Sequence, residues 1–316
     1  MSAISTDQPA AGSPAASRPG GGAARGRTGD APPHGRERGG GEGGPLNVFS
    51  GAFLLLWAVL AAGPLLWVMV NSLRDSGSIQ GAPFGWPDTL SLENFANAWS
   101  DADIGRYTLN SVIILAGSLP GTMLLGSMAA YVIARFSFRG NRAIYLLFAG
   151  GMMFPIILAV VPLFFVMDNL SLLDTRPGLI LAYIAYSLPF TTFFMTAFFR
   201  TLPGSVAEAA TIDGASHTRT FFQIMLPMAK PGLISIGIFN FLGQWNQYFL
   251  PLALNAENRE RALLTQGLAE LSVSQGYEGD WGALFAGLTI AMLPILVVYL
   301  VFQRQVQDGL TAGAVK

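Results

Sequence analysis

The side chains that usually carry enzymatic chemistry are scarce in this sequence of 316 residues. It has no cysteine, so it offers no thiolate nucleophile, disulfide or cysteine metal site. Its histidines are His34 and His217, too few for histidine-based metal chemistry. Neither lysine completes a Gly-x-x-x-x-Gly-Lys-Ser/Thr phosphate-binding loop, because Lys230 precedes a proline and no residue follows Lys316. We therefore expect no catalytic residue and no metal site, and any ATP that drives this protein must bind another chain.

Polar side chains with helical spacing interrupt one apolar stretch near residue 240. Four of them stand at positions i, i+4, i+7 and i+8, which places amides and a phenol on one helix face. Amides can satisfy sugar hydroxyls in pairs, and aromatic rings can stack on a pyranose. A structural role is the alternative, because Asn and Gln often join membrane helices, and Trp and Tyr often anchor helix ends. The predicted substrate-path residues are Asn240, Gln244, Trp245, Asn246, Gln247 and Tyr248, with Tyr183, Tyr186, Ser187, Thr191 and Thr192 as weaker candidates.

The connection at residues 200–230 is the second region with a functional pattern. Connections in helix bundles usually take about 2–8 residues, so one of this length should have structure of its own. Ser205 and Glu208 have the spacing of a capping box, which predicts a short helix with Ser205 as its N-cap. Asp213-Gly214 should end this helix, because Gly214 can adopt a positive φ at little cost.

A second short helix should follow in the same connection. Ser216 is a suitable N-cap for it. Leu226-Pro227 is predicted to end it, and Pro231 suits the first turn of the next apolar stretch. We therefore expect two short helices at a fixed angle on the inner membrane surface. The second should present on one face the apolar side chains Phe221, Phe222 and Met225.

Long apolar stretches must position both groups of residues. The chain is 52% apolar and only 12% charged, about half the charge that soluble chains carry. A bilayer core takes about 20 apolar residues per helix, and one charge at the centre costs about 2.5–3.5 kcal/mol. Stretches of this length without Asp, Glu, Lys or Arg predict an all-α integral membrane protein. The six predicted transmembrane helices are residues 48–70, 109–134, 143–167, 178–199, 231–254 and 281–303.

Charges between the stretches predict the orientation. With the N-terminus inside, most of the 18 Lys and Arg residues lie on the cytoplasmic side, as the positive-inside rule requires. Arg135, Arg139 and Arg142 in one short connection are the strongest indication. We therefore expect both termini in the cytoplasm. The net charge of −1 gives no electrostatic reason to expect a nucleic-acid partner.

The N-terminal segment, residues 1–45, differs in composition from the rest of the chain. It is rich in Gly and Pro, and its only branched aliphatic residue is Ile4. Such a segment cannot bury enough apolar surface to offset the entropy of ordering. We expect a disordered cytoplasmic tail at 1–45 and a membrane domain at 46–316.

The connection at residues 200–230 resembles the EAA loop of permease subunits of bacterial ABC importers. Residues 241–251, Phe-Leu-Gly-Gln-Trp-Asn-Gln-Tyr-Phe-Leu-Pro, and the chain end at 309–316 resemble the maltose-type sugar permeases in particular. The resemblance covers about residues 48–316, and the order of the elements agrees throughout. The motif in the connection is carried by Glu208, Ala209, Ala210, Asp213, Gly214 and Ala215, followed by Phe222, Ile224, Leu226 and Pro227.

The resemblance implies the binding-protein-dependent, MetI-like permease fold with six membrane helices, in a bacterial plasma membrane. It implies that a homologous permease forms the other half of the path. Two ATPase subunits would bind ATP and Mg²⁺, so this chain would not be an enzyme. A sugar-binding protein outside the cell would deliver its solute to residues 71–108 and 255–280. The ATPase-coupling residues would be Glu208, Ala209, Ala210, Asp213, Gly214, Ala215, Phe222, Leu226 and Pro227.

Other functions remain open on the sequence. An importer permease for another solute, such as a polyamine or phosphate, is the main alternative. A proton- or sodium-coupled carrier is disfavoured, because such carriers often place ionisable groups near the bilayer midplane. A passive channel would not need the connection at 200–230. Within the sugars, the sequence leaves open glucose, maltose- or cellobiose-type oligomers, and N-acetylglucosamine or its dimer.

Overall fold

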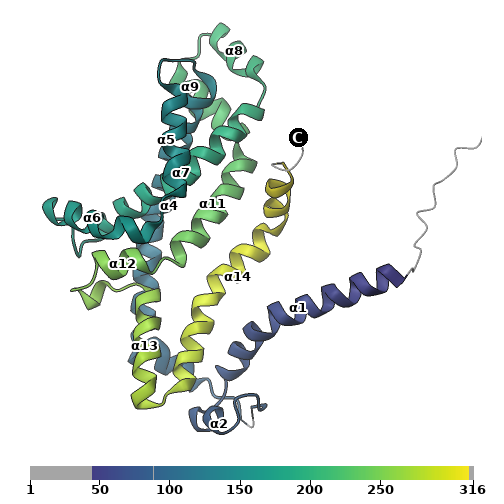
Figure 1. The fold of residues 1–316 in the computed structure, drawn as a ribbon, viewed down its shortest axis with the longest axis vertical. Helices are drawn as coiled ribbons and strands as arrows, with labels where there is room; N and C mark the ends of the chain where they lie inside the picture. Colours follow the sequence, from purple (N-terminus) through teal and green to yellow (C-terminus); the bar gives the residue numbers. More distant parts are fainter. Residues whose placement is uncertain (1–44, 88, 313–316) are drawn as a thin grey trace, which may run out of the picture. The chain divides into compact units, whose positions relative to one another are not determined.

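The computed structural model describes residues 45–87 and 89–312 (Figure 1). The predicted tail at 1–45, apart from Pro45, and the chain end beyond residue 312 lie outside the described residues. Contacts divide the chain into the units Met1–Phe53 and Leu54–Lys316, and every contact discussed below lies within the second unit.

The described residues are predominantly helical. The longer α-helices are α1 (Pro45–Asn71), α4 (Ile104–Arg135), α5 (Asn141–Met153), α6 (Ile156–Asn169), α7 (Arg176–Thr201), α8 (Gly204–Ile212), α11 (Lys230–Trp245), α13 (Leu264–Glu278) and α14 (Trp281–Ala312). Shorter α-helices are α2 (Ser76–Gly81), α3 (Glu93–Ala96), α9 (His217–Thr220), α10 (Leu226–Met228) and α12 (Phe249–Leu254). Three single turns of other types are the π-helical η1 (Asn97–Asp101) and η2 (Phe221–Met225) and the 3₁₀-helical η3 (Arg259–Arg261).

Four of the predicted transmembrane stretches are single helices long and apolar enough to cross a bilayer. They lie in α1, α4, α7 and α14. Two bent helix pairs pass the same test of length and composition, so the described residues contain four to six candidate spans. An all-helical membrane fold is thereby confirmed.

The third predicted stretch, 143–167, is not one straight helix. α5 and α6 meet there at an angle of 106°. Pro155 has no N–H to continue the helical ladder, and it forces the residue before it out of the helical region. Phe154 accordingly has an extended backbone, with φ −78° and ψ 122°. The sequence pattern of apolar residues continues across this break, so length alone did not reveal it.

The fifth predicted stretch, 231–254, is also interrupted. α11 ends at Trp245, and the separate short helix α12 begins at Phe249. A continuous helix would push the ring of Pro251 against the carbonyl of Gln247, which explains a break upstream of the proline. At its start α11 is bent by 77° from the preceding helix, His217–Met228.

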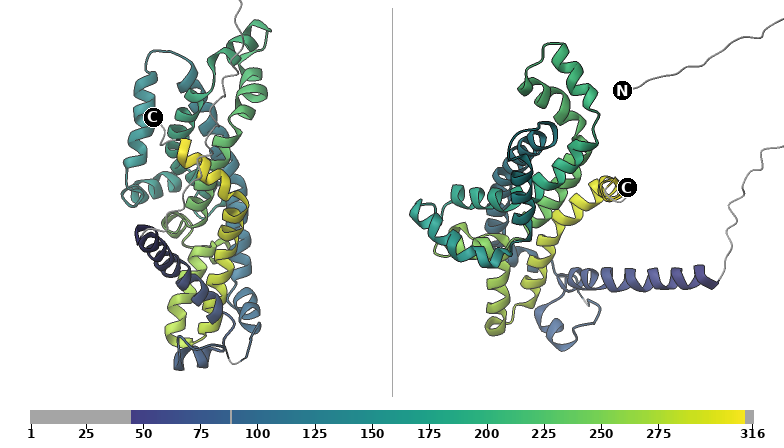
Figure 2. Two further views of the ribbon diagram at one scale, coloured as in Figure 1. Left: turned by 90° about the vertical axis from the view of Figure 1, so that its right-hand side faces the viewer. Right: turned by 45° about the horizontal axis from the view of Figure 1, so that its top comes forward.

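Close contact between α4 and α7 forms the centre of the bundle, as both figures show (Figure 2). Glycines on α4 make this contact possible, because larger residues would hold the helices apart. A Cβ on Gly121 would lie 2.6 Å from Cδ1 of Ile184, and one on Gly126 would lie 2.6 Å from Cγ2 of Thr191. α11 packs against both helices and against α14. The bundle carries α8 and α9 at one end and α2 and α13 at the other (Figure 1).

Candidate functional site

The first candidate site is the helical elbow, residues 204–228, which contains most of the predicted coupling residues. Its first helix, α8, begins at Gly204, and its N-cap residue Pro203 makes no side-chain capping bond. The predicted capping box is therefore wrong, and Ser205 lies inside the first turn. The proline explains the shift, because its fixed φ of −60° with ψ 128° already directs the chain into the helix two residues earlier.

Glu208 is consequently free of the capping role considered for it. Its side chain is exposed and makes no hydrogen bond within the described residues. A Cβ on Gly204 would lie 3.9 Å from Glu208 Oε1 and 3.7 Å from Arg135 Nη1. Both charged groups therefore flank the start of α8, and the carboxylate remains available to a partner.

The turn between the two helices of the elbow agrees with the prediction. α8 ends at Ile212, and Gly214 has a φ of +78°. The amide of Asp213 donates to the carbonyl of Ala209 at 2.9 Å, and the amide of Ala215 donates to that of Ala210 at 2.9 Å. Ser216 then caps the next helix, its hydroxyl accepting from the amide of Arg219 at 3.3 Å. These bonds fix the angle of the elbow.

The second helix of the elbow departs from the prediction in two ways. It continues through Pro227 to Met228, because the proline follows a π-helical turn and lies where no backbone donor is needed. The predicted apolar face is also divided. Phe221 and Met225 are buried, whereas Phe222 is 42% exposed. Phe222 is thus left partly uncovered by the described part of the chain.

An aromatic cluster fastens the elbow to the bundle. The ring of Phe221 lies 5.1 Å from that of Tyr131 on α4 and 6.4 Å from that of Phe199 on α7. Phe199 and Met225 are fully buried in this cluster. Arg135 Nη2, at the end of α4, also donates to the carbonyl of Leu202 at 2.7 Å. These contacts attach the elbow to the ends of two long helices.

The outer surface of the elbow combines a hollow with exposed apolar groups. The hollow has a volume of about 520 Å³. Ile212, 86% exposed, lies at the end of α8. The small side chains leave room for close approach by another protein. The hollow is lined by Ser205, Val206, Ala209, Ala210, Asp213 and Ile224.

The predicted substrate-path residues divide into two groups in the structure. Gln244 is buried, and it joins three helices: its Oε1 accepts from Ser118 Oγ at 2.7 Å, and its Nε2 donates to Ser187 Oγ at 3.0 Å. Asn240 is buried as well, and its Nδ2 donates to Thr191 Oγ1 at 2.9 Å. Trp245 Nε1 donates to the carbonyl of Ala291 on α14 at 3.1 Å. These contacts support the structural role.

Gln247 and Tyr248 do not share a helix face with Asn240 and Gln244. The predicted common face is wrong because α11 ends at Trp245. The Asn246 amide group bonds back to the carbonyl of Leu242 at 2.9 Å, and Gln247 Oε1 accepts from the amide of Phe249 at 3.2 Å. These side chains complete the break between α11 and α12.

An uncharged aromatic pocket lies beside Asn240. It has a volume of about 280 Å³ and sits where the α5–α6 break meets α7 and α11. Tyr186 and Phe239 are about half exposed in it. The sequence indicated Tyr186, Ser187 and Asn240 but missed the phenylalanines, because Phe in an apolar run looks the same whether it faces lipid or a pocket. The lining residues are Gly151, Met152, Phe154, Tyr186, Ser187, Pro189, Phe190, Phe239, Asn240 and Gly243.

A polar hollow of about 280 Å³ lies at the opposite end of the bundle from the elbow. Its walls include Asp101, Asp103, Glu270 and Asp280, with Arg259 among them. A hydrogen bond with Tyr107, followed by the charge of Glu270, raises the pKa of Arg259. Within the described residues, no group of three or more His, Cys, Asp or Glu side chains is placed to hold a metal ion.

Comparison with known proteins gives consistent results. Residues 122–311 match the family model of the binding-protein-dependent transport system inner membrane component. The chain is 53% identical over 264 residues to the diacetylchitobiose uptake system permease protein NgcG of Streptomyces coelicolor, covering 84% of this chain and 87% of the relative. It is 35% identical over 272 residues to the trehalose transport system permease protein SugB of Mycobacterium tuberculosis, covering 82% and 97%.

A solved structure shares the fold. A chain of a bacterial ABC transporter involved in the import of the acidic polysaccharide alginate superposes with a TM-score of 0.71 and 22% sequence identity. The match covers 82% of this chain and 95% of that chain.

Proposed function

The chain belongs to the family of binding-protein-dependent transport system inner membrane components, and we propose that, as the permease subunit of a sugar ABC importer, it conducts a disaccharide of N-acetylglucosamine. The observation that carries this proposal is the 53% identity to a diacetylchitobiose uptake permease over most of both chains. A relative named for trehalose transport is only 35% identical. The neutral disaccharide of N-acetylglucosamine is therefore preferred over the other sugars that the sequence left open.

The pocket between α5, α7 and α11 supports a neutral solute. Its lining contains the phenol of Tyr186, the ring of Phe239 and the amide of Asn240, and no carboxylate. A polyamine would need acidic partners, since a buried charge without one is strongly disfavoured. We assign this pocket to the substrate path, while Gln244 and Trp245 hold the helices around it.

The elbow is the proposed contact with an ATPase subunit. Its exposed members provide the contact surface: Glu208 and Asp213 supply charge, and Phe222 supplies an apolar anchor. Ala210, which is buried, instead holds α8 against the rest of the elbow. The coupling residues of this proposal are Glu208, Ala209, Ala210, Asp213, Gly214, Ala215, Phe222, Leu226 and Pro227.

Movement follows from this arrangement. Closure of two ATPase subunits on ATP displaces the elbow, and the aromatic cluster of Tyr131, Phe199 and Phe221 carries the displacement into α4 and α7. A packed interface of this kind moves as a rigid body. The breaks at Phe154–Pro155 and after Trp245 let the outer halves change angle, which opens the pocket to the other side.

The proposal is tested by reconstituting the chain with its homologous permease, its ATPase subunits and its sugar-binding protein in liposomes. ATP-dependent uptake of labelled diacetylchitobiose is expected to exceed that of trehalose by at least about tenfold, a difference of about 1.4 kcal/mol. Uptake of trehalose or a polyamine in preference to diacetylchitobiose would refute the assignment. Uptake without nucleotide would refute the ATP-driven mechanism.

A further inference from the structure

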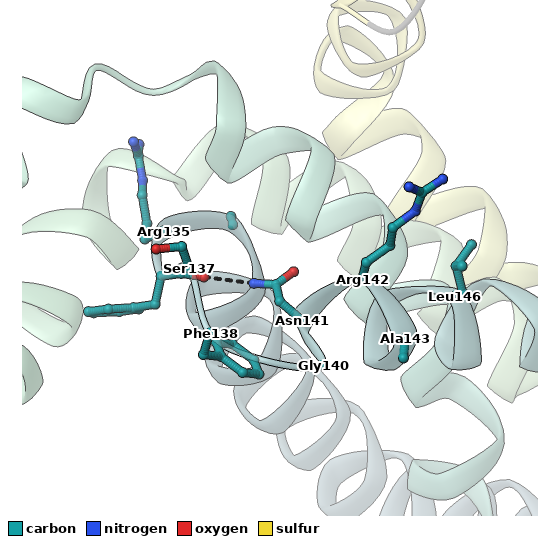
Figure 3. A pocket seen from close by; sticks show the side chains of 10 residues that line it. Arg135, Ser137, Phe138, Gly140, Asn141, Arg142, Ala143 and Leu146 are labelled. Atoms are coloured by element: carbon teal, nitrogen blue, oxygen red, sulfur yellow. Dashed lines mark hydrogen bonds between the residues drawn. The ribbon is translucent and has the colours of Figure 1, made fainter.

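The connection between α4 and α5 borders an open hollow that the proposed transport mechanism does not use. Its volume is about 800 Å³. Figure 3 shows the side chains of Arg135 and Arg142 extending to the same side of the connection, with that of Leu146 beside Arg142. The lining residues are Ala134, Arg135, Phe136, Ser137, Phe138, Gly140, Asn141, Arg142, Ala143 and Leu146.

The polar part of the hollow is positively charged. Arg142 lines the hollow and is exposed, and it belongs to no ion pair in the part of the chain that the structure describes. Arg139, outside the lining, is a second exposed arginine in the same connection. Arg135 uses Nη2 on the carbonyl of Leu202, while its Nε is buried without a partner among the described residues. Residues 134–146 contain no Asp or Glu. A guanidinium fork matches the oxygens of a phosphate group, so this charge favours a phosphate.

The other part of the hollow is apolar and continuous with the exposed surface of α5. Leu146 stands one turn after Arg142 on the same helix face and is 55% exposed. Leu147 is 73% exposed, and Phe138 is 40% exposed. None of the residues of α5 is buried. A free phosphate would leave these groups in water, whereas a phospholipid would cover them with its acyl chains.

We propose that this hollow binds an anionic phospholipid, with its phosphate on Arg142 and its acyl chains along Phe138 and Leu146. The inference rests on the membrane placement used in the proposed function. Basic pockets between membrane helices on the cytoplasmic side are suited to such headgroups. The bond from Arg135 to Leu202 joins this connection to the base of the elbow, so the bound lipid holds the elbow's attachment at the bilayer surface.

The test uses the complete transporter complex, purified in detergent after exchange into a mixture of phosphatidylglycerol and phosphatidylethanolamine. Mass spectrometry counts the lipids that each complex retains. Arg142→Gln is expected to lower retained phosphatidylglycerol about fivefold, the effect of about one arginine charge at an anionic surface, without changing retained phosphatidylethanolamine. Arg142→Lys keeps the charge and is expected to retain most of the phosphatidylglycerol. Arg304→Gln, an exposed arginine on α14, is the matched control and should behave as the wild type.

Three results would overturn the proposal. Equal phosphatidylglycerol on the wild type and Arg142→Gln would show that the hollow holds no lipid. Loss of the ATPase subunits from Arg142→Gln at unchanged lipid content would make the hollow a protein contact. Displacement of phosphatidylglycerol by millimolar inorganic phosphate would identify a free-phosphate site. Lipid counting does not depend on sugar uptake, so these results are separable from a failure of the proposed transport function.

Discussion

Individual polar residues in this chain have roles that their positions in the sequence left open. Glu208 loses its capping role because Pro203 already starts the helix. The side-chain amide of Gln244 bonds to three hydroxyls, two on α4 and one on α7. The phenylalanine at 239, ordinary in an apolar run, lines a pocket instead. The role of each side chain is thus decided by the groups that the fold places within its reach.

Glu208 tests the charge on the elbow. Glu208→Gln preserves the size of the side chain and disturbs no hydrogen bond in the described structure, so α8 should remain folded. We expect it to lower sugar-stimulated ATPase activity about tenfold, and Glu208→Lys to abolish it, because a buried charge contact with a partner is worth about 1.5–3 kcal/mol. Asp168→Asn, which changes an exposed carboxylate near the end of α6, outside the elbow and the predicted binding-protein contacts, is the control. Wild-type activity in Glu208→Lys would contradict a docking role.

Phe239 and Gln244 separate the substrate path from the helix scaffold. Phe239→Ala removes a partly exposed ring, so transport should fall at least about tenfold while the Tm in detergent changes little. Gln244→Leu removes bonds to Ser118, Thr122 and Ser187, which should cost about 2 kcal/mol and lower the Tm. Uptake assays and thermal unfolding of both variants provide the measurements. The reverse pattern would place the path at Gln244.

At the scale of the helices, small residues and prolines decide the architecture. Glycines let α4 and α7 come into contact, and Pro155 and Pro251 mark the breaks in two apolar stretches. The elbow differs from these breaks, because an aromatic cluster packs it onto the ends of α4 and α7. In the proposed mechanism the elbow is therefore rigidly attached, whereas the helices beyond the breaks at Pro155 and Pro251 can change their angle.

The contact of α4 with α7 can be tested at Gly126. A Cβ there would lie 2.6 Å from Cγ2 and 2.9 Å from Cβ of Thr191, a β-branched side chain with little freedom to move. Gly126→Ala is expected to destabilise the protein by about 1–3 kcal/mol, as overpacking does. Gly237→Ala is the matched control, because its new Cβ would meet only Cε of Met123 at 4.0 Å. Equal thermal stability of the two variants would rule out close α4–α7 packing.

At the scale of the whole molecule, the elbow and the polar hollow beside Arg259 lie at opposite ends of the bundle. This separation fits a permease that receives an ATPase on one side of the membrane and a binding protein on the other. The uncharged pocket lies between the two ends. The arrangement therefore predicts that the elbow is accessible from the cytoplasm and that the opposite end of the bundle is accessible from outside the cell.

The orientation is testable because the chain has no cysteine of its own. Thr218→Cys places an exposed thiol on the elbow, and Glu257→Cys places one in the connection between α12 and α13. A membrane-impermeant maleimide added to intact spheroplasts is expected to label Glu257→Cys only. Thr218→Cys should react only after the membrane is permeabilised. Labelling of Thr218→Cys in intact spheroplasts would reverse the predicted orientation.

The sequence by itself determined the class of the protein, the approximate spans and the elbow. Charge-free apolar stretches can be stable only in lipid, and the turn at Asp213-Gly214 and the cap at Ser216 are set by neighbours in the chain. Only the tertiary structure decided that Asn240 and Gln244 join helices and that Phe239 lines a pocket. It also decided that Phe221 is buried while Phe222 is exposed. These outcomes depend on which helix lies opposite each side chain, and contacts across Thr191 or Tyr131 leave no periodic signal in the sequence of either partner.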